Sequence, residues 1–206
     1  MNLKTLKLAE ASFLDRYPGG FKNPEIECIA KKHSLDKMSL LAQDLFKEDH
    51  FDDPKTIAEH MVKVIGRSSM VSVFEKAKFR DFARGLGSYE SEVLAQGLRE
   101  QLYGNEQNGF ELVLSILRME KLGKWPLMTI IPLYFKPTVN VFVKPTTVKN
   151  MIAFLKLPLT YNPTPTWEFY AAYRTIFNDM KQKVSPLLSP NNGAFSGFFM
   201  MTMTEE

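Results

Sequence analysis

The sequence predicts a mainly α-helical protein, a multi-helix single domain with an irregular proline-rich segment and at most a small β element. Apolar residues recur at helical spacing over most of the chain, and capping residues, glycines and prolines separate these stretches. The 206 residues are 45% hydrophobic and 24% charged, which is typical of a globular domain with a buried core. We expect one domain over 1–206, with a helical block 1–123, an extended proline-rich insert 124–145, a helical block 146–190 and a packed tail 191–206.

The first helices are marked by their start and stop signals. The sequence YPGG at 17–20 ends the first helix, and Pro24 begins the second. Ser34 suits the N-cap of the third, and Asp53 followed by Pro54 suits the start of the fourth. The apolar positions with helical spacing in these stretches are Leu3, Leu6, Phe13, Leu14, Ile26, Ile29, Met38, Leu41, Leu45, Ile57, Met61, Val64 and Ile65.

Further helices complete the first block. Ser68 or Ser69 is expected to cap a helix that ends at Gly85. Another is expected to start at Ser88 and stop at Gly104, and the stretch 109–122 has the clearest helical pattern.

The pattern then changes, because the insert 124–145 holds four prolines that a regular long helix does not accommodate. The alternation VNVFV at 139–143 is the best strand candidate. Thr146 or Thr147 is expected to cap the next helix, and 166–184 is predicted as the last long helix. The tail segment 193–203 is expected to be an edge strand or a packed extended segment.

The formal net charge of +3 hides an uneven distribution. Residues 1–103 carry 16 basic and 16 acidic side chains, whereas 104–206 carry 10 and 7. The segment 121–167 contains six lysines and no Asp or Glu, and it holds seven of the twelve prolines. Aromatic residues lie between these lysines. Because no carboxylate is near in sequence, this segment is a candidate surface for a polyanion.

We therefore expect a binding protein whose partner is nucleic acid or another polyanion. Phosphate contacts would come from exposed lysines, and stacking or core support from an aromatic side chain. Free N–H groups at the start of a helix would add to an anion site. The alternative is that acidic neighbours come from other parts of the fold and that the aromatic residues belong to the core. The candidate residues are Lys124, Trp125, Lys136, Lys144, Thr146, Thr147 and Lys149.

Other functional classes receive less support from the sequence. Neither a phosphate-binding loop nor a G-x-S-x-G nucleophile motif is present, and no catalytic residue, metal ligand set or cofactor is predicted. An enzyme whose site is assembled only by folding remains an alternative, with Glu75, Arg80 and His60 as candidates. A protein–protein interaction or homo-oligomeric scaffold role is another, because methionines gather at Met200, Met201 and Met203.

The sequence also suggests a cellular location. A single cysteine, Cys28, excludes a disulfide within the chain. The N-terminal residues lack the continuous apolar run of a signal peptide, and no stretch reaches the length of an apolar membrane span. A cytoplasmic protein with no membrane partner is expected.

One block of the sequence resembles a family of uncharacterised bacterial proteins, over about residues 120–175. The resemblance implies a bacterial intracellular protein and carries no fold or activity. The residues that carry it are Lys124-Trp125-Pro126, Thr129, Pro132, Pro137, Val141-Phe142-Val143-Lys144-Pro145, Lys149 and Tyr161-Asn162-Pro163.

Overall fold

The protein is mainly α-helical, as the sequence predicted. The computed structural model describes residues 1–203, and no strand occurs among them. The helices are α1 (Leu3–Arg16), α2 (Pro24–His33), α3 (Leu35–Leu45), α4 (Pro54–Arg67), α5 (Val73–Gly85), α6 (Ser88–Tyr103), α7 (Glu106–Arg118), α8 (Trp125–Phe135), α9 (Pro145–Phe154), α10 (Trp167–Lys181) and α11 (Asn192–Met203).

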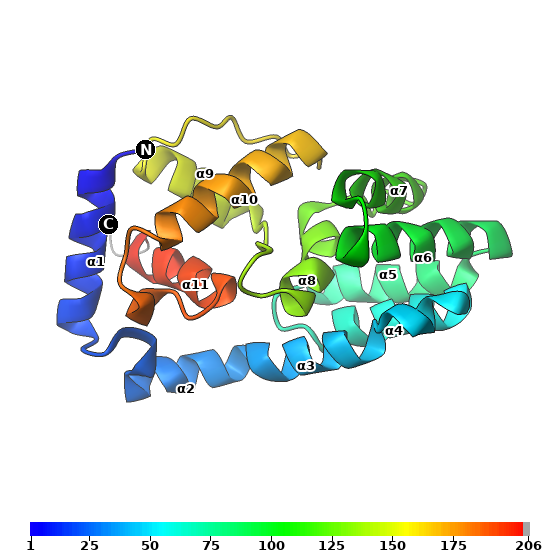
Figure 1. The fold of residues 1–206 in the computed structure, drawn as a ribbon, viewed down its shortest axis with the longest axis horizontal. Helices are drawn as coiled ribbons and strands as arrows, with labels where there is room; N and C mark the ends of the chain where they lie inside the picture. Colours follow the sequence, from blue (N-terminus) through cyan, green and yellow to red (C-terminus); the bar gives the residue numbers. More distant parts are fainter. Residues whose placement is uncertain (204–206) are drawn as a thin grey trace.

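The molecule is elongated, and α8 lies near its middle (Figure 1). Helices α4 to α7 form one end, and α1, α9, α10 and α11 form the other. Helices α2 and α3 run nearly in line along one edge and connect the two ends, with the left-handed residue Ser34 as the joint between them. Helix α8 contacts α3, α4, α6 and α7, so it is part of the core of the end that α4 to α7 form.

Local capping signals explain most helix starts. The Asp53 carboxylate accepts hydrogen bonds from the backbone N–H groups of Lys55 and Thr56, which confirms the predicted start of α4. The predicted cap of α5 was wrong, because Ser72 holds that position. Ser68 is instead buried, with its hydroxyl hydrogen-bonded to the Tyr134 hydroxyl at 2.8 Å.

The prediction of an extended insert over 124–145 was wrong for residues 125–135, which form α8. Pro126 is tolerated because the first turn of a helix needs no N–H donor. Pro132 lies inside the helix and costs about 3 kcal/mol in helix propensity. Each large apolar side chain buried on α8 contributes about 1.5–3 kcal/mol, so burial of the whole helix outweighs the proline. None of the helices in residues 1–203 is long and apolar enough to cross a membrane.

The strand predicted at 139–143 was also wrong. This stretch is part of a connector, residues 136–144, that has no neighbouring strand to pair with. Side chains bond its backbone instead. The Val143 N–H donates to the Thr129 hydroxyl at 3.1 Å, and the Val139 carbonyl accepts from the Asn178 amide at 2.9 Å. Residues 140–143 are all buried and Val139 is exposed, so the alternating sequence does not correspond to one buried and one exposed face.

The tail was expected to be extended, and this was wrong for 192–203, which form α11. Phe195, Phe198 and Phe199 are fully buried, at the spacing of one helix face. Two of them contact Phe177 of α10 with ring centroids 5.0 and 6.4 Å apart. Their aromatic packing stabilises a helix whose glycines lower its intrinsic propensity.

Candidate functional site

The candidate anion-binding residues divide into exposed and buried side chains. Lys124, Lys136, Lys144, Thr146 and Lys149 are exposed. Thr147 is 5% exposed and Trp125 only 1%. The Trp125 indole N–H donates to the Asn162 carbonyl at 2.7 Å, and its ring lies against Phe110 and Phe169. Of the two roles expected for Trp125, the structure gives it core support.

The exposed lysines are spread along the molecule. Lys124 and Lys136 lie at opposite ends of α8, which places their backbones about 18 Å apart at 1.5 Å per residue. Lys144 precedes the first turn of α9, and Lys149 lies on that helix with its ammonium 5.1 Å from the centre of the Tyr161 ring. This arrangement suits an extended anion better than a single small one.

The lysines of 121–167 lack acidic partners in the described structure. None of them forms an ion pair with a carboxylate of residues 1–203. The Lys136 ammonium donates to the Leu102 carbonyl at 2.6 Å, so it is held by a neutral group. The neighbouring elements of the fold therefore place no described carboxylate in an ion pair with these lysines.

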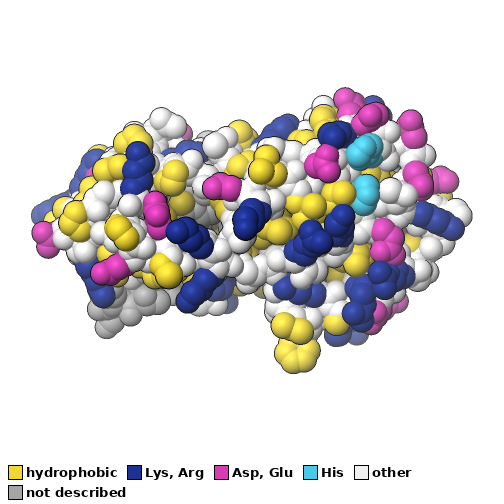
Figure 2. Space-filling view, turned by 90° about the horizontal axis from the view of Figure 1, so that it is seen from below, with side chains coloured by type: hydrophobic (Ala, Val, Ile, Leu, Met, Phe, Trp, Pro, Cys, Tyr) yellow, Lys and Arg dark blue, Asp and Glu magenta, His cyan; other side chains and the backbone are white. Residues whose placement is uncertain are grey.

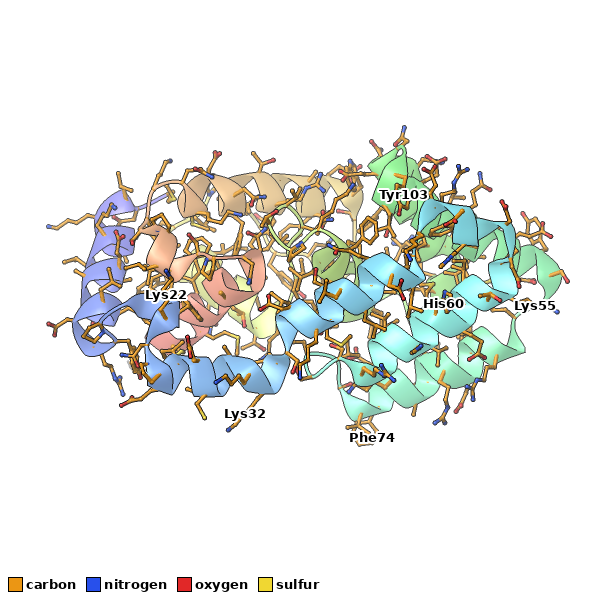
Figure 3. All side chains as sticks on the ribbon, turned by 60° about the horizontal axis from the view of Figure 1, so that its bottom comes forward. Lys22, Lys32, Lys55, His60, Phe74 and Tyr103 are labelled. Atoms are coloured by element: carbon orange, nitrogen blue, oxygen red, sulfur yellow. The ribbon has the colours of Figure 1, made fainter. Side chains whose placement is uncertain are left out.

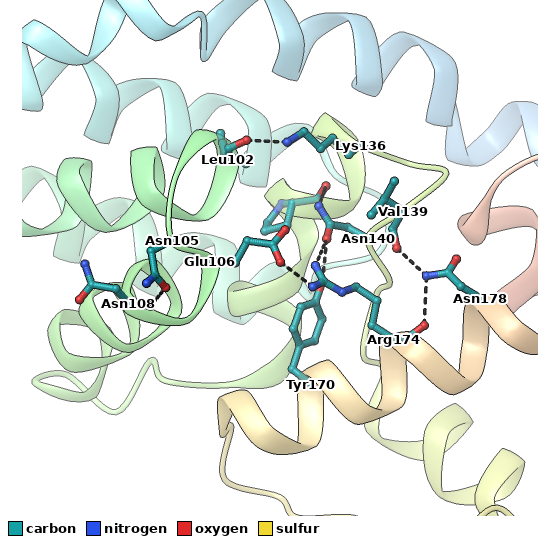
Figure 4. A network of polar contacts seen from close by, with 11 residues as sticks. Leu102, Asn105, Glu106, Asn108, Lys136, Val139, Asn140, Tyr170, Arg174 and Asn178 are labelled. Atoms are coloured by element: carbon teal, nitrogen blue, oxygen red, sulfur yellow. Dashed lines mark hydrogen bonds and ion pairs between the residues drawn. The ribbon is translucent and has the colours of Figure 1, made fainter.

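A polar network beneath the connector fixes its position (Figure 4). Arg174 of α10 donates to the Glu106 carboxylate at the start of α7 and to the Asn140 side-chain oxygen of the connector. The Tyr170 hydroxyl donates to the same Asn140 oxygen. Burial is the largest single effect on the pKa of Arg174 and lowers it, but the hydrogen bonds and charge interactions with Glu106 and Tyr170 together outweigh burial, so that pKa is raised. The network thus joins α7, the connector and α10.

Asparagine and lysine side chains anchor the rest of the connector. The Asn192 amide donates to the Asn140 carbonyl at 2.9 Å, and its side-chain oxygen accepts from the Lys181 ammonium at 2.7 Å. Lys181 also donates to the Thr138 carbonyl at 2.6 Å. These contacts come from α10 and α11, so the C-terminal helices hold the segment between Lys136 and Lys144.

Burial of tyrosines beside this network predicts sensitivity to alkali. Burial raises the pKa of Tyr170 to about 12 and also raises the pKa of Tyr173. An unfolded tyrosine ionises near pH 10, so stability is present below pH 10 and is lost as pH rises to about 12, by about 2–3 kcal/mol for Tyr170. Urea unfolding at increasing pH should show this loss, and Tyr170→Phe should reduce it. An equal loss in the variant would contradict the assignment.

A crevice beside the network contains one polar group without a partner. The Gln101 side chain is 7% exposed, and its amide nitrogen has no hydrogen-bond partner among the described residues. The crevice has a volume of about 10 Å³ and is also lined by Asn140 and Arg174. That is about the size of one water molecule. The sequence signal was a polar residue at the helical spacing of Leu94 and Leu98.

His50, in the short 3-10 turn Glu48–Asp52, and His60 of α4 lie with their ring centroids 6.0 Å apart, and Figure 2 shows two histidine side chains close together on this surface. The Nδ1 atoms of His50 and His60 lie 3.0 and 2.9 Å from the same Leu45 carbonyl oxygen. A carbonyl oxygen only accepts hydrogen bonds, so each Nδ1 carries a hydrogen. A catalytic zinc site has three protein ligands, and these two imidazoles supply only two. No group of three or more potential metal-ligating side chains occurs in residues 1–203.

The three residues considered for an enzyme site that forms only on folding, Glu75, Arg80 and His60, each bond to a different partner. Glu75 accepts from the Ser72 hydroxyl, and Arg80 pairs with its neighbour Asp81. His60 bonds the Leu45 carbonyl instead. No hydrogen bond or ion pair within 1–203 links one of the three candidates to another.

Three comparisons with known proteins found no similar protein. A scan against protein-family models, a search of the curated proteins and a search of the solved structures each found no match.

Proposed function

We propose that the protein is a non-enzymatic binding protein that engages an extended polyanion, with nucleic acid as the first candidate. The observation that carries this proposal is that the lysines of 121–167 are exposed and none is paired with a carboxylate of the described residues. Phosphate contacts from Lys124, Lys144 and Lys149 are its main element.

The burial of aromatic side chains limits the kind of recognition we propose. Trp125, Tyr134, Phe135 and Phe142 are each at most 8% exposed, so they do not offer stacking surfaces to bases. Binding would then depend on phosphate contacts, which carry little sequence information. We expect affinity that depends strongly on salt and weakly on base sequence.

A charge-reversal series tests this function. Labelled single-stranded DNA, double-stranded DNA and RNA are titrated with the protein at several salt concentrations. Lys124→Glu/Lys144→Glu/Lys149→Glu should weaken binding at least about tenfold and reduce the slope of log affinity against log salt by about 2–3, since each phosphate contact contributes about 0.9.

The matched control changes the same charge at exposed lysines elsewhere. Lys22→Glu/Lys32→Glu/Lys55→Glu alters residues on the side of the molecule formed by the first helices (Figure 3). This variant should keep most of the salt slope. Absence of binding to all three nucleic acids at low salt would overturn the proposal, and so would equal losses in the two triple variants.

A further inference from the structure

A second surface feature lies at the far end of the molecule from α9. A groove with a volume of about 550 Å³ is lined by residues of the C-terminal part of α5, the start of α6 and the chain after α7. Its size falls in the range of ligand-binding pockets. Apolar side chains contribute to its lining, namely Phe82, Leu86, Met119 and Leu122.

Among the apolar lining residues, Met119 is exposed, Phe82 and Leu86 are half-buried, and Leu122 is buried. Met119 is 60% exposed, although large apolar side chains usually gain stability from burial. The two glycines at the turn, Gly85 and Gly87, also line the groove, and nothing lies within 4 Å of a Cβ placed at Gly85. Met119 is unbranched and flexible, which suits contact with a partner side chain of variable shape.

The charged side chains around the groove are mostly acidic. Asp81, Glu90 and Glu120 line it, against the single cation Lys78. Asp81 pairs with Arg80, whereas Glu90 and Glu120 form no ion pair within residues 1–203. The groove therefore combines exposed apolar surface with carboxylates that are available to cationic groups.

We propose that this groove docks a cationic amphipathic segment of a partner protein. An apolar side chain of the segment packs against Met119 and Leu86, and its Lys or Arg side chains pair with Glu90 and Glu120. Charge complementarity selects this occupant, because a polyanion would be repelled by the same carboxylates. The site uses carboxylates and apolar side chains in place of the lysines of 121–167, so its test does not depend on the proposed polyanion binding.

The test uses the full chain and a labelled helical peptide made of leucine and lysine, with a leucine–glutamate peptide of the same pattern for comparison. The leucine–lysine peptide should bind saturably, and the leucine–glutamate peptide should not. Glu90→Lys/Glu120→Lys should weaken binding by about tenfold or more, since two favourable charge pairs are lost and reversal adds repulsion. Met119→Ser should weaken it separately.

Matched controls show whether peptide binding depends on the groove residues or on any exposed carboxylate or apolar side chain. Glu92→Lys reverses an exposed carboxylate of α6 outside the groove, and Leu40→Ser removes an exposed apolar side chain of α3. Both should bind the peptide as the unmodified protein does. Equal binding of the two peptides, or equal losses in groove and control variants, would overturn the proposal. A dimer in light scattering that Met119→Ser dissociates would also overturn it, because a second copy would then occupy the groove.

Discussion

Replacing Gly109 with alanine is expected to lower the free energy of unfolding by about 3 kcal/mol, because overpacking a tight helix contact forces the backbone to move. A Cβ at this position would lie 2.3 Å from the Gln101 backbone nitrogen and 2.5 Å from the Gly97 carbonyl oxygen. Both contacts are to the backbone of α6, which no rotamer change can relieve. The α6–α7 pair would have to separate, and it is the most extensive helix contact of the fold.

Urea unfolding monitored by circular dichroism measures this effect. Gly66→Ala is the matched control, because nothing lies within 4 Å of a Cβ placed there. That variant should be more stable by about 0.5–1 kcal/mol, since alanine loses less conformational entropy in a helix. If Gly109→Ala were as stable as Gly66→Ala, the close approach of α6 and α7 would be contradicted.

Replacing Arg174 with methionine is expected to cost about 3 kcal/mol, in the range found when one partner of a buried ion pair is removed. The Arg174 and Glu106 side chains are 17% and 33% exposed, so Glu106 would be left partly desolvated without its partner. Asn140 would lose a donor, and the contacts of the guanidinium with the Trp167 and Tyr170 rings would also be lost.

An exposed ion pair provides the control for this prediction. Arg84 and Glu59 are 56% and 52% exposed, so Arg84→Met should change the free energy of unfolding by less than about 1 kcal/mol. Chemical denaturation of both variants gives the comparison. Equal small losses would mean that the Arg174 network does not hold the connector. Addition of Glu106→Gln to Arg174→Met should recover part of the loss, because the uncompensated carboxylate is removed.

Local signals in the sequence were sufficient for the amphipathic helices. Asp53 accepts hydrogen bonds from two backbone N–H groups and Pro54 has a fixed backbone angle, so both residues specify the start of α4 within a single turn. The same reasoning placed the break at 17–20 between α1 and α2. Such interactions involve residues close in sequence, so they can be predicted without knowledge of the rest of the fold.

The candidate site was predictable only in part. The absence of carboxylates from 121–167 is a property of the sequence, whereas the lack of paired acidic neighbours and the burial of Trp125 depend on distant segments. Arg174 and Glu106 are separated by 68 positions, and neither showed a local pattern that would indicate their contact. The acidic groove likewise combines residues from α5, α6 and the chain after α7.

By itself, the sequence determined that the protein is mainly helical, where helices such as α2 and α4 begin, and that one long segment carries only positive charge. It did not determine every helix start, since Ser72 caps α5, and Lys144, not Thr146 or Thr147, holds the N-cap position of α9. The tertiary structure decided that α8 and α11 are helices and that 139–143 is an unpaired connector. Helix α8 is buried on all sides, so its sequence lacks a polar face and shows no helical period. Residues 139–143 alternate like a strand, but a strand needs a partner, and side chains from α10 and α11 bond this backbone instead.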